Sequence, residues 1–272
     1  MFLSCHQQDK KKEDVFRYVF MGHIYDEKPI IDKRISKRKL EQFNQIWLGG
    51  DLTYDSGVTW KLNYLDSVLN IKSNKTHWAL GNHDIESGRD KVLNFINKPP
   101  YYASYVNGIT VLVFDSNYND QGDCKEVNEQ TDYIKMVCDT ISNSSHLILM
   151  GHHVPWGKIE NIDAWSFANT SIENRVFMCD SFDFFDQVIY PELVNVQNKN
   201  IQVIGLAGDL GQKQSTFEYR TNDSIYLLAN GNLSDNLYNQ QFKKCNSNDS
   251  VLIFNHCPKF RSLTWKFVDV GN

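Results

Sequence analysis

Residues 76–84 read Thr-His-Trp-Ala-Leu-Gly-Asn-His-Asp. This stretch begins as a short apolar strand and ends in a glycine followed by amide, imidazole and carboxylate side chains. Glycine at a strand end lets the backbone turn sharply, so that the next side chains can point into a crevice at the edge of a sheet. The stretch therefore predicts a strand that delivers polar groups to a site.

Four other apolar segments run into a polar, glycine-containing cluster in the same way. These clusters are Gly22-His23, Gly49-Gly50-Asp51, Gly151-His152-His153 and Gly208-Asp209-Leu210-Gly211. A single Gly-Asp at a strand end is more often an ordinary turn, so the prediction depends on all five clusters together. Ligands of open α/β sheets gather beyond the carboxyl ends of the strands. Imidazole, carboxylate and amide oxygen suit Zn²⁺, Mn²⁺ or Fe, and we expect a metal site there.

The hydrophobic pattern alternates strands and helices over the first two-thirds of the chain, and strands dominate the end. Strands are expected at 15–20, 46–48, 76–80, 101–106, 109–114, 146–150, 201–207, 216–220, 225–229, 251–254 and 263–268, and helices at 33–45, 58–69, 85–96, 131–141 and 182–196. The pattern predicts an α/β fold, a four-layer α/β-β/α sandwich of two mixed sheets with helices outside. We expect a flexible tether at 1–14 and one domain at 15–272, closed by a C-terminal β segment.

Composition and charge argue against several classes of protein. The chain has 272 residues, 41% of them hydrophobic, which is enough for a real core. The net charge of −5 argues against a dedicated nucleic-acid-binding surface. No apolar run approaches the roughly 18 residues needed to cross a bilayer.

The order of the five clusters resembles that of the calcineurin-like metallophosphoesterases, a family that includes the purple acid phosphatases. That family shows Asp-X-His, Gly-Asp, Gly-Asn-His-Asp/Glu, a His at a strand end, and Gly-His-X-His. Gly50-Asp51 and residues 81–84 match fully, residues 149–152 resemble the fourth block, and residues 50–54 resemble the Gly-Asp-X-X-Tyr form of purple acid phosphatases. The resemblance spans roughly residues 15–232 and implies a metallo-dependent phosphatase-like fold.

Two blocks depart from the family pattern. Met21 stands where the family has its first Asp, and the final Gly-His-X-His has become residues 208–211. Asp209 can replace a histidine as an oxygen ligand, whereas Gly211 has no side chain that could bind a metal.

The resemblance implies two metal positions bridged by Asp51. One position is complete, and its ligands would be Asp51, Asn82, His152 and Asp209. The other keeps only His23 and Asp51. Tyr54 or Asp26 could add to it, although ordinary packing is the alternative interpretation of Tyr54. We therefore expect one tightly bound divalent metal, Mn, Zn or Fe, and a second that binds weakly or only with substrate.

The resemblance also implies catalytic roles for His83, Asp84 and His153. His83 would protonate the leaving alkoxide, Asp84 would orient His83, and His153 would neutralise charge on the phosphate. The expected function is a metal-dependent hydrolase of phosphate mono- or diesters that uses metal-activated water on a phosphorylated substrate. The alternative is a degenerate family member that binds a metal or a phosphorylated ligand without turnover, because two ligand positions are lost.

The cysteines suggest two further hypotheses. Cys245 and Cys257 flank a predicted strand and could form a disulfide. Phe2-Leu3-Ser4-Cys5 followed by a charged tether resembles the end of a bacterial lipoprotein signal, so Cys5 could carry a lipid in a periplasmic or membrane-anchored protein. An ordinary N-terminus of a cytoplasmic protein is the alternative.

Overall fold

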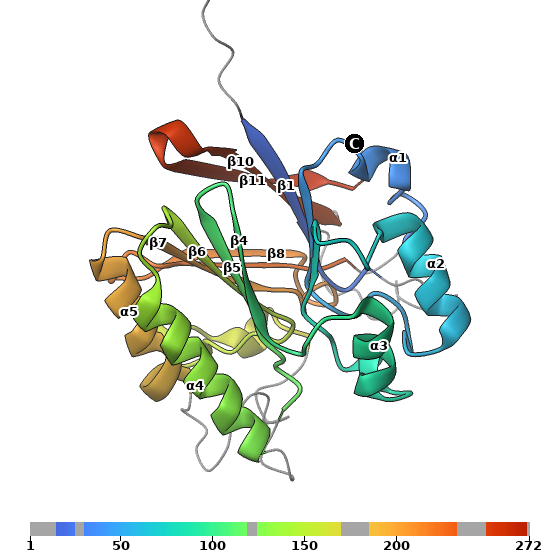
Figure 1. Ribbon diagram of the computed structural model, residues 1–272, viewed down its shortest axis with the longest axis horizontal. Helices are drawn as coiled ribbons and strands as arrows, with labels where there is room; N and C mark the ends of the chain where they lie inside the picture. The colour runs from blue at the N-terminus through green and yellow to red at the C-terminus, as the bar shows by residue number, and fades with distance from the viewer. Residues whose placement is uncertain (1–14, 25–29, 119–123, 170–184, 233–248, 271–272) are drawn as a thin grey trace, which may run out of the picture.

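Two mixed β-sheets pack face to face, and helices cover the outer face of each (Figure 1). The computed structural model describes residues 15–24, 30–118, 124–169, 185–232 and 249–270. Four layers follow one another in the order helix, sheet, sheet, helix, which confirms the expected sandwich.

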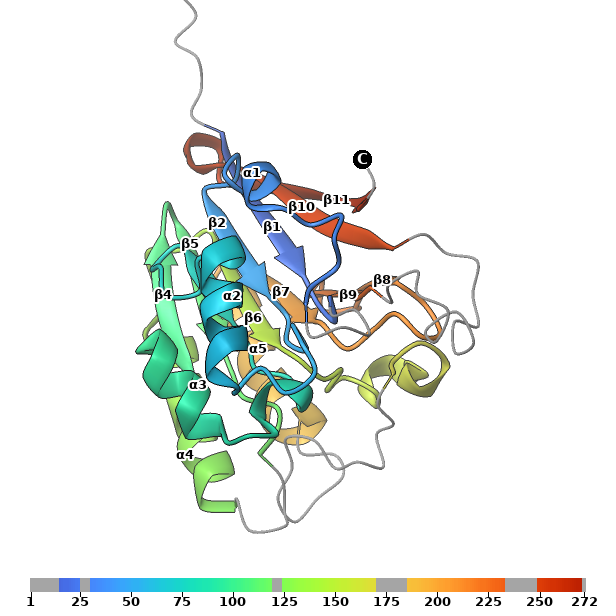
Figure 2. The ribbon, with the colours of Figure 1, turned by 90° about the vertical axis from the view of Figure 1, so that its right-hand side faces the viewer.

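The first sheet has the strand order β11-β10-β1-β2-β3. Its strands are β1 (Phe16–Met21), β2 (Gln45–Leu48), β3 (Thr76–Trp78), β10 (Ser250–Cys257) and β11 (Ser262–Asp269). β1, β2 and β3 run parallel, and β10 pairs antiparallel with β1. The C-terminal hairpin expected from the sequence therefore exists, and it extends this sheet (Figure 2).

The second sheet has the order β4-β5-β6-β7-β9-β8. Its strands are β4 (Tyr102–Val106), β5 (Ile109–Val113), β6 (His146–Gly151), β7 (Gln202–Ala207), β8 (Thr216–Arg220) and β9 (Tyr226–Asn230). β5, β6, β7 and β9 are parallel, and the two edge strands β4 and β8 are antiparallel to their neighbours. All these strands lie close to the ranges expected from the sequence.

Helices of unequal length cover the sheets. α1 (Lys37–Leu40), α2 (Thr59–Leu69) and α3 (Arg89–Ile96) pack on the first sheet, and α4 (Cys124–Thr140) and α5 (Tyr190–Asn198) pack on the second (Figure 1). The short helical turns are η1 (His83–Ile85), η2 (Ile159–Asn161), η3 (Ala164–Ser166), η5 (Phe185–Ile189) and η6 (Pro258–Phe260). Within the described residues, no helix is both long and apolar enough to span a membrane.

Alternation along the strands assigns each side chain to one of three apolar layers. Tyr18 and Phe20 face the second sheet, whereas Val19 and Met21 pack against the helices of the first. Ile148 and Met150 of β6 complete the layer between the sheets. This period of two is the expected consequence of strand geometry.

The structure corrects three expectations. The helix predicted at 33–45 is only α1, four residues long, and no side chain caps its N-terminus. The helix predicted at 85–96 is two elements, because Gly88 adopts a φ of 112° between η1 and α3. Cys257 is a free thiol, so the predicted pairing with Cys245 is wrong, whereas Cys124 is disulfide-bonded.

Candidate metal centre

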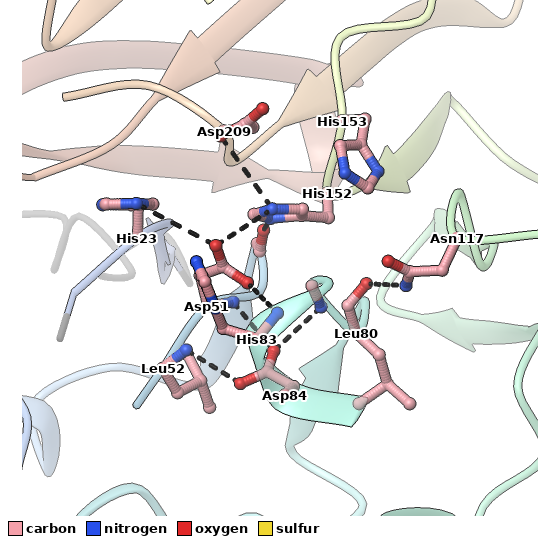
Figure 3. Close-up of polar contacts among 12 residues, drawn as sticks. His23, Asp51, Leu52, Leu80, His83, Asp84, Asn117, His152, His153 and Asp209 are labelled. Atoms are coloured by element: carbon pink, nitrogen blue, oxygen red, sulfur yellow. Dashed lines mark hydrogen bonds and ion pairs between the residues drawn. The ribbon is translucent and has the colours of Figure 1, made fainter. Parts of the chain in front are cut away.

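The carboxyl ends of β1, β2 and β3 in one sheet and of β6 and β7 in the other meet at one edge of the sandwich. Adjacent strands end at nearly the same level, since Met21 pairs with Leu48 and Gly151 pairs with Ala207. The polar clusters that follow them therefore converge, and Figure 3 shows His23 and Asp51 facing His152 and Asp209.

Glycines bring the two sheets together at this edge. A Cβ added to Gly208 would overlap the backbone of Gly49, and one on Gly22 would overlap Gly208. A Cβ on Gly81 would overlap the carboxylate of Asp51. These clusters contain glycine because backbone segments pass closer than any side chain allows.

His152 has the geometry of a metal ligand. Its Nδ1 donates to the carbonyl oxygen of Gly49 at 2.7 Å, since a carbonyl can only accept. Among the described residues, no group forms a hydrogen bond with the buried Nε2, which lies 3.4 Å from Asp51 Oδ2 and 4.0 Å from Asp209 Oδ1. Burial by itself lowers the pKa of His152, but the two carboxylates raise it to about 10. The surroundings of Nε2 thus favour a cation.

His23 repeats this arrangement from the other sheet. Its Nδ1 donates to the carbonyl oxygen of Asn232 at 3.0 Å, and its Nε2 lies 3.9 Å from Asp51 Oδ2. The backbone of His23 is left-handed, with a φ of 49°. Non-glycine residues in this conformation cost about 1 kcal/mol or more and cluster at functional sites.

Asp51 stands between the two histidines. Its Oδ1 accepts from the backbone N–H of His83 at 3.0 Å, while Oδ2 faces His23 and His152. Burial by itself raises the pKa of Asp51, but His152 and then His23 bring it well below its usual range. Asp51 also has a left-handed φ, 52°. A carboxylate held ionised between two imidazoles is suited to bridge metals.

Asp84 ties together the loops that follow β2 and β3. Its carboxylate accepts from the backbone N–H groups of Asp51, Leu52 and Gly81 at 2.8, 3.0 and 2.8 Å. It also accepts from Ser56 Oγ at 2.7 Å and from Trp78 Nε1 at 3.2 Å. Both oxygens are thus engaged with loop groups, and burial, followed by the charge of Asp51, raises the pKa of Asp84 to about 6.

The carboxylate that contacts the imidazole of His83 is Glu86. The Nδ1 of His83 lies 2.7 Å from Glu86 Oε1, one helical turn away in η1. The resemblance implies that Asp84 makes this contact, and the structure shows Glu86 in its place. Its spacing of three residues from His83 was the available signal, because such residues are neighbours on a helical surface.

His153 lies beside His152, with the ring centroids 4.6 Å apart, and is a neutral imidazole. Its Nδ1 is 2.8 Å from Ser116 Oγ, and that oxygen accepts from the backbone N–H of His153 at 3.0 Å. Burial, followed by the charge of His152, lowers the pKa of His153 to about 4. Ser116 is not among the residues expected from the sequence, although the polar residues that follow β5 are a signal of the same kind as the other clusters. Nearby, Asn117 donates to the carbonyl oxygen of Leu80 at 2.8 Å and so joins the loops of the two sheets (Figure 3).

Three of these side chains form a group able to hold a metal ion. One ligand atom from each of His152, His153 and Asp209 lies within 4.8 Å of the others, and all three residues are buried. The structure thus places His153 beside the predicted ligands His152 and Asp209, with Asp51 and His23 adjoining on the side of the first sheet. Imidazole nitrogen with carboxylate oxygen suits several divalent ions.

The other residues predicted for the site are not part of the group formed by His152, His153 and Asp209. Asn82 is exposed and directly precedes η1. Tyr54 is 55% exposed, and its ring centroid is 5.0 Å from that of His83. Met21 packs in the apolar layer beneath the helices. Asp26 and Cys5 lie outside the described residues.

Comparison with known proteins gives distant likenesses to solved structures. The chain matches no family model and no curated protein. Among solved structures, it is similar to a phosphopantetheinyl hydrolase from Mycobacterium tuberculosis, with a TM-score of 0.41, 11% identity, and coverage of 85% of this chain and 94% of that one. It is also similar to vacuolar protein sorting 29 from Cryptosporidium parvum, with a TM-score of 0.39, 8% identity, and coverage of 93% and 97%. Likenesses at this level assign no function, so the proposal below depends on this chain's own residues.

Proposed function

We propose that this protein is a metal-dependent hydrolase of phosphate mono- or diesters. The observation that carries the proposal is the arrangement of groups around the imidazole of His152. Its Nδ1 is committed to Gly49, and its buried Nε2 lies between two carboxylates from different sheets. A histidine oriented by a backbone carbonyl in this way is typical of metal ligands.

The residues present fit a divalent ion. His152, His153 and Asp209 would hold it, and Asp51 with His23 would hold a second, weaker one. A divalent ion bound there would polarise a phosphate and make a water acidic enough to attack at neutral pH. This ligand set differs from the one expected from the resemblance. His153 joins it as a neutral ligand, the exposed Asn82 is left out, and Asp51 is assigned to the second ion.

The remaining residues support proton transfer and positioning. His83 would give a proton to the leaving oxygen, while Glu86 holds its ring through Nδ1. Asp84 would act as a positioning residue, because its oxygens hold the backbone on either side of Asp51.

Metal counting combined with a hydrolysis assay tests the proposal. Purified protein should bind at least one equivalent of Mn²⁺, Zn²⁺ or Fe and cleave a chromogenic phosphomonoester or diester. His152→Ala should abolish both, whereas His77→Ala, at a buried histidine outside the group, should preserve both. Binding of no metal by the wild-type protein would overturn the proposal.

A non-catalytic binding protein is the second candidate. Its supporting observation is that Met21 is part of the apolar layer and Gly211 has no side chain, so two ligands of the second metal position are lost. Metal binding without hydrolysis of either ester, whichever ion is supplied, would favour this candidate.

A further inference from the structure

Tyr54 presents an exposed aromatic ring beside His83. The two ring centroids are 5.0 Å apart with planes inclined by 36°, and 55% of Tyr54 is exposed. One side of the phenol ring therefore packs on the imidazole, and much of the remainder faces solvent. If His83 protonates the leaving oxygen, a group attached to that oxygen would emerge close to this ring.

The loop that carries Tyr54 is rigidly held. Thr53 and Ser56 are fully buried and joined by a 2.9 Å bond between their hydroxyl oxygens. The carboxylate of Asp55 accepts from the backbone N–H of Ser87 at 3.0 Å and from its hydroxyl at 2.6 Å. The loop thus keeps Tyr54 in place while leaving its ring outside the core.

The backbone of Tyr54 itself is also anchored. Lys61, only 8% exposed, donates from Nζ to the carbonyl oxygen of Tyr54. The same Nζ lies 5.9 Å from the centroid of the Trp60 ring, and Trp60 is 51% exposed. The backbone of Tyr54 is therefore held by a buried ammonium group, while its ring lies beside the proposed general acid. A scattered exposed aromatic residue needs no explanation, but one held in place beside a candidate catalytic residue is positioned to contact a substrate.

We propose that Tyr54 is a specificity-determining residue that stacks on a planar aromatic group in the leaving alcohol, such as the base of a nucleoside phosphate. The inference rests on the proposed hydrolase function and names its substrate class. A fixed aromatic ring loses little conformational entropy on binding, and base stacking on aromatic residues is sequence-tolerant and favourable. Such an interaction discriminates between substrates through kcat/KM.

Two substrates that differ in the presence of a nucleobase provide the test. Adenosine 5′-monophosphate and ribose 5-phosphate release phosphate from the same kind of primary oxygen, but only the first carries a base. Wild-type protein should prefer the nucleotide. Tyr54→Ala should reduce that preference about tenfold, which is the order expected for one stacked base. Tyr54→Phe should restore it, because the stacking face is kept.

Tyr105→Ala is the matched control, since Tyr105 is 61% exposed on β4 and pairs with Thr110, near the far end of the sheet. It should leave the preference unchanged. An unchanged preference in Tyr54→Ala, or equal loss for both substrates, would overturn the inference.

A binding measurement separates this inference from the hydrolase proposal. Titration of adenosine, which contains no phosphate, should show weaker binding to Tyr54→Ala than to wild type by calorimetry. If neither substrate is hydrolysed but adenosine binding depends on Tyr54, hydrolysis is rejected and the stacking role stands. If hydrolysis occurs and adenosine binding is equal in both proteins, the stacking role is rejected.

Discussion

His152 and His153 are neighbours in the chain, yet their pKa values move in opposite directions. Both are buried, and burial alone disfavours the charged imidazole in each. Only His152 has its Nε2 within 4.0 Å of two carboxylate oxygens, so its pKa rises to about 10 while that of His153 falls to about 4. The role first expected for His153, neutralising phosphate charge, would need a cation. A neutral ligand fits its environment better.

The contact between His83 and Glu86 leads to a prediction for catalysis. His83→Ala should lower kcat at least 100-fold, the usual contribution of a general acid, and leave metal content unchanged. Glu86→Gln should lower kcat about tenfold with little effect on KM, because the ring loses its orienting carboxylate. Steady-state kinetics and metal analysis check both variants. Loss of metal in His83→Ala would make His83 a ligand instead.

The five donors around Asp84 lead to a prediction for stability. An Asn side chain would turn an N–H₂ group toward donors that need acceptors, and each buried group left unsatisfied costs about 1–3 kcal/mol. Asp84→Asn should therefore lower the free energy of unfolding by at least about 3 kcal/mol in urea titrations. Asp90→Asn, an exposed carboxylate in the first turn of α3, should change it by less than about 1 kcal/mol. Similar small losses in the two variants would contradict this account.

At the level of the elements, the two sheets approach most closely where the backbone after β2, at Gly49, passes the backbone after β7, at Gly208. Gly208→Ala would force a methyl group into the backbone of Gly49, and backbone cannot rotate away as a side chain can. We expect this variant to lose metal binding and to unfold at lower temperature. Gly57→Ala should be milder, because its methyl group would meet the Ser87 side chain at 3.1 Å. Calorimetry with and without metal distinguishes the two, and full metal affinity in Gly208→Ala would refute the proposed importance of this crossing.

Two buried histidines link β6 to the C-terminal hairpin. The rings of His146 and His256 lie 5.6 Å apart, edge to face. Burial, followed by the charges of His256 and Arg261, lowers the pKa of His146 to about 4, from an ordinary value of 6.5. The unfolded chain therefore binds more protons than the folded one between these pH values, and stability is lost as pH falls from about 6.5 toward 4.

This difference predicts the acid sensitivity of the fold. Lowering pH from 7 to 4 should cost up to about 3 kcal/mol through His146, and His146→Gln should remove that part of the slope. His77, whose pKa burial and then Lys98 lower to about 4, should maintain a residual slope in this variant. Urea titrations across the pH range provide the measurement. An unchanged slope in His146→Gln would contradict the assignment.

For the whole molecule, metal binding should raise the stability of the fold. The proposed ligands of the first ion follow β6 and β7 of the second sheet, and Asp51 of the first sheet adjoins them, with its Oδ2 3.4 Å from His152 Nε2. A ligand that binds only the folded state stabilises it by about 2.7 kcal/mol at 100 times its Kd. The metal-loaded protein should therefore melt roughly 5–10 °C above the chelator-treated protein. Asp51→Asn should reduce this gain. Equal melting temperatures with and without every ion tested would count against a metal centre.

The strands, the layers and the edge at which polar groups gather could all be predicted from local sequence patterns. Strand periodicity and glycine at strand ends are local features, so the arms of the β4–β5 hairpin and the position of β6 could be predicted within a few residues. Helices were harder to delimit, because α1 is only four residues long and because the positive φ of Gly88 sets the start of α3.

The contacts that each polar group makes depend on how the chain folds in three dimensions. The acceptor that orients His152 is the carbonyl oxygen of Gly49, 103 residues away, and the acceptor for His23 is 209 residues away. No local pattern encodes such contacts, because they form only after the two sheets meet at glycine. The packing of the loops also places Glu86 against the imidazole of His83, while the carboxylate of Asp84 accepts hydrogen bonds from the backbone. Residue types thus determined which chemistry is available, and the close approach of two sheets decided which atoms face one another.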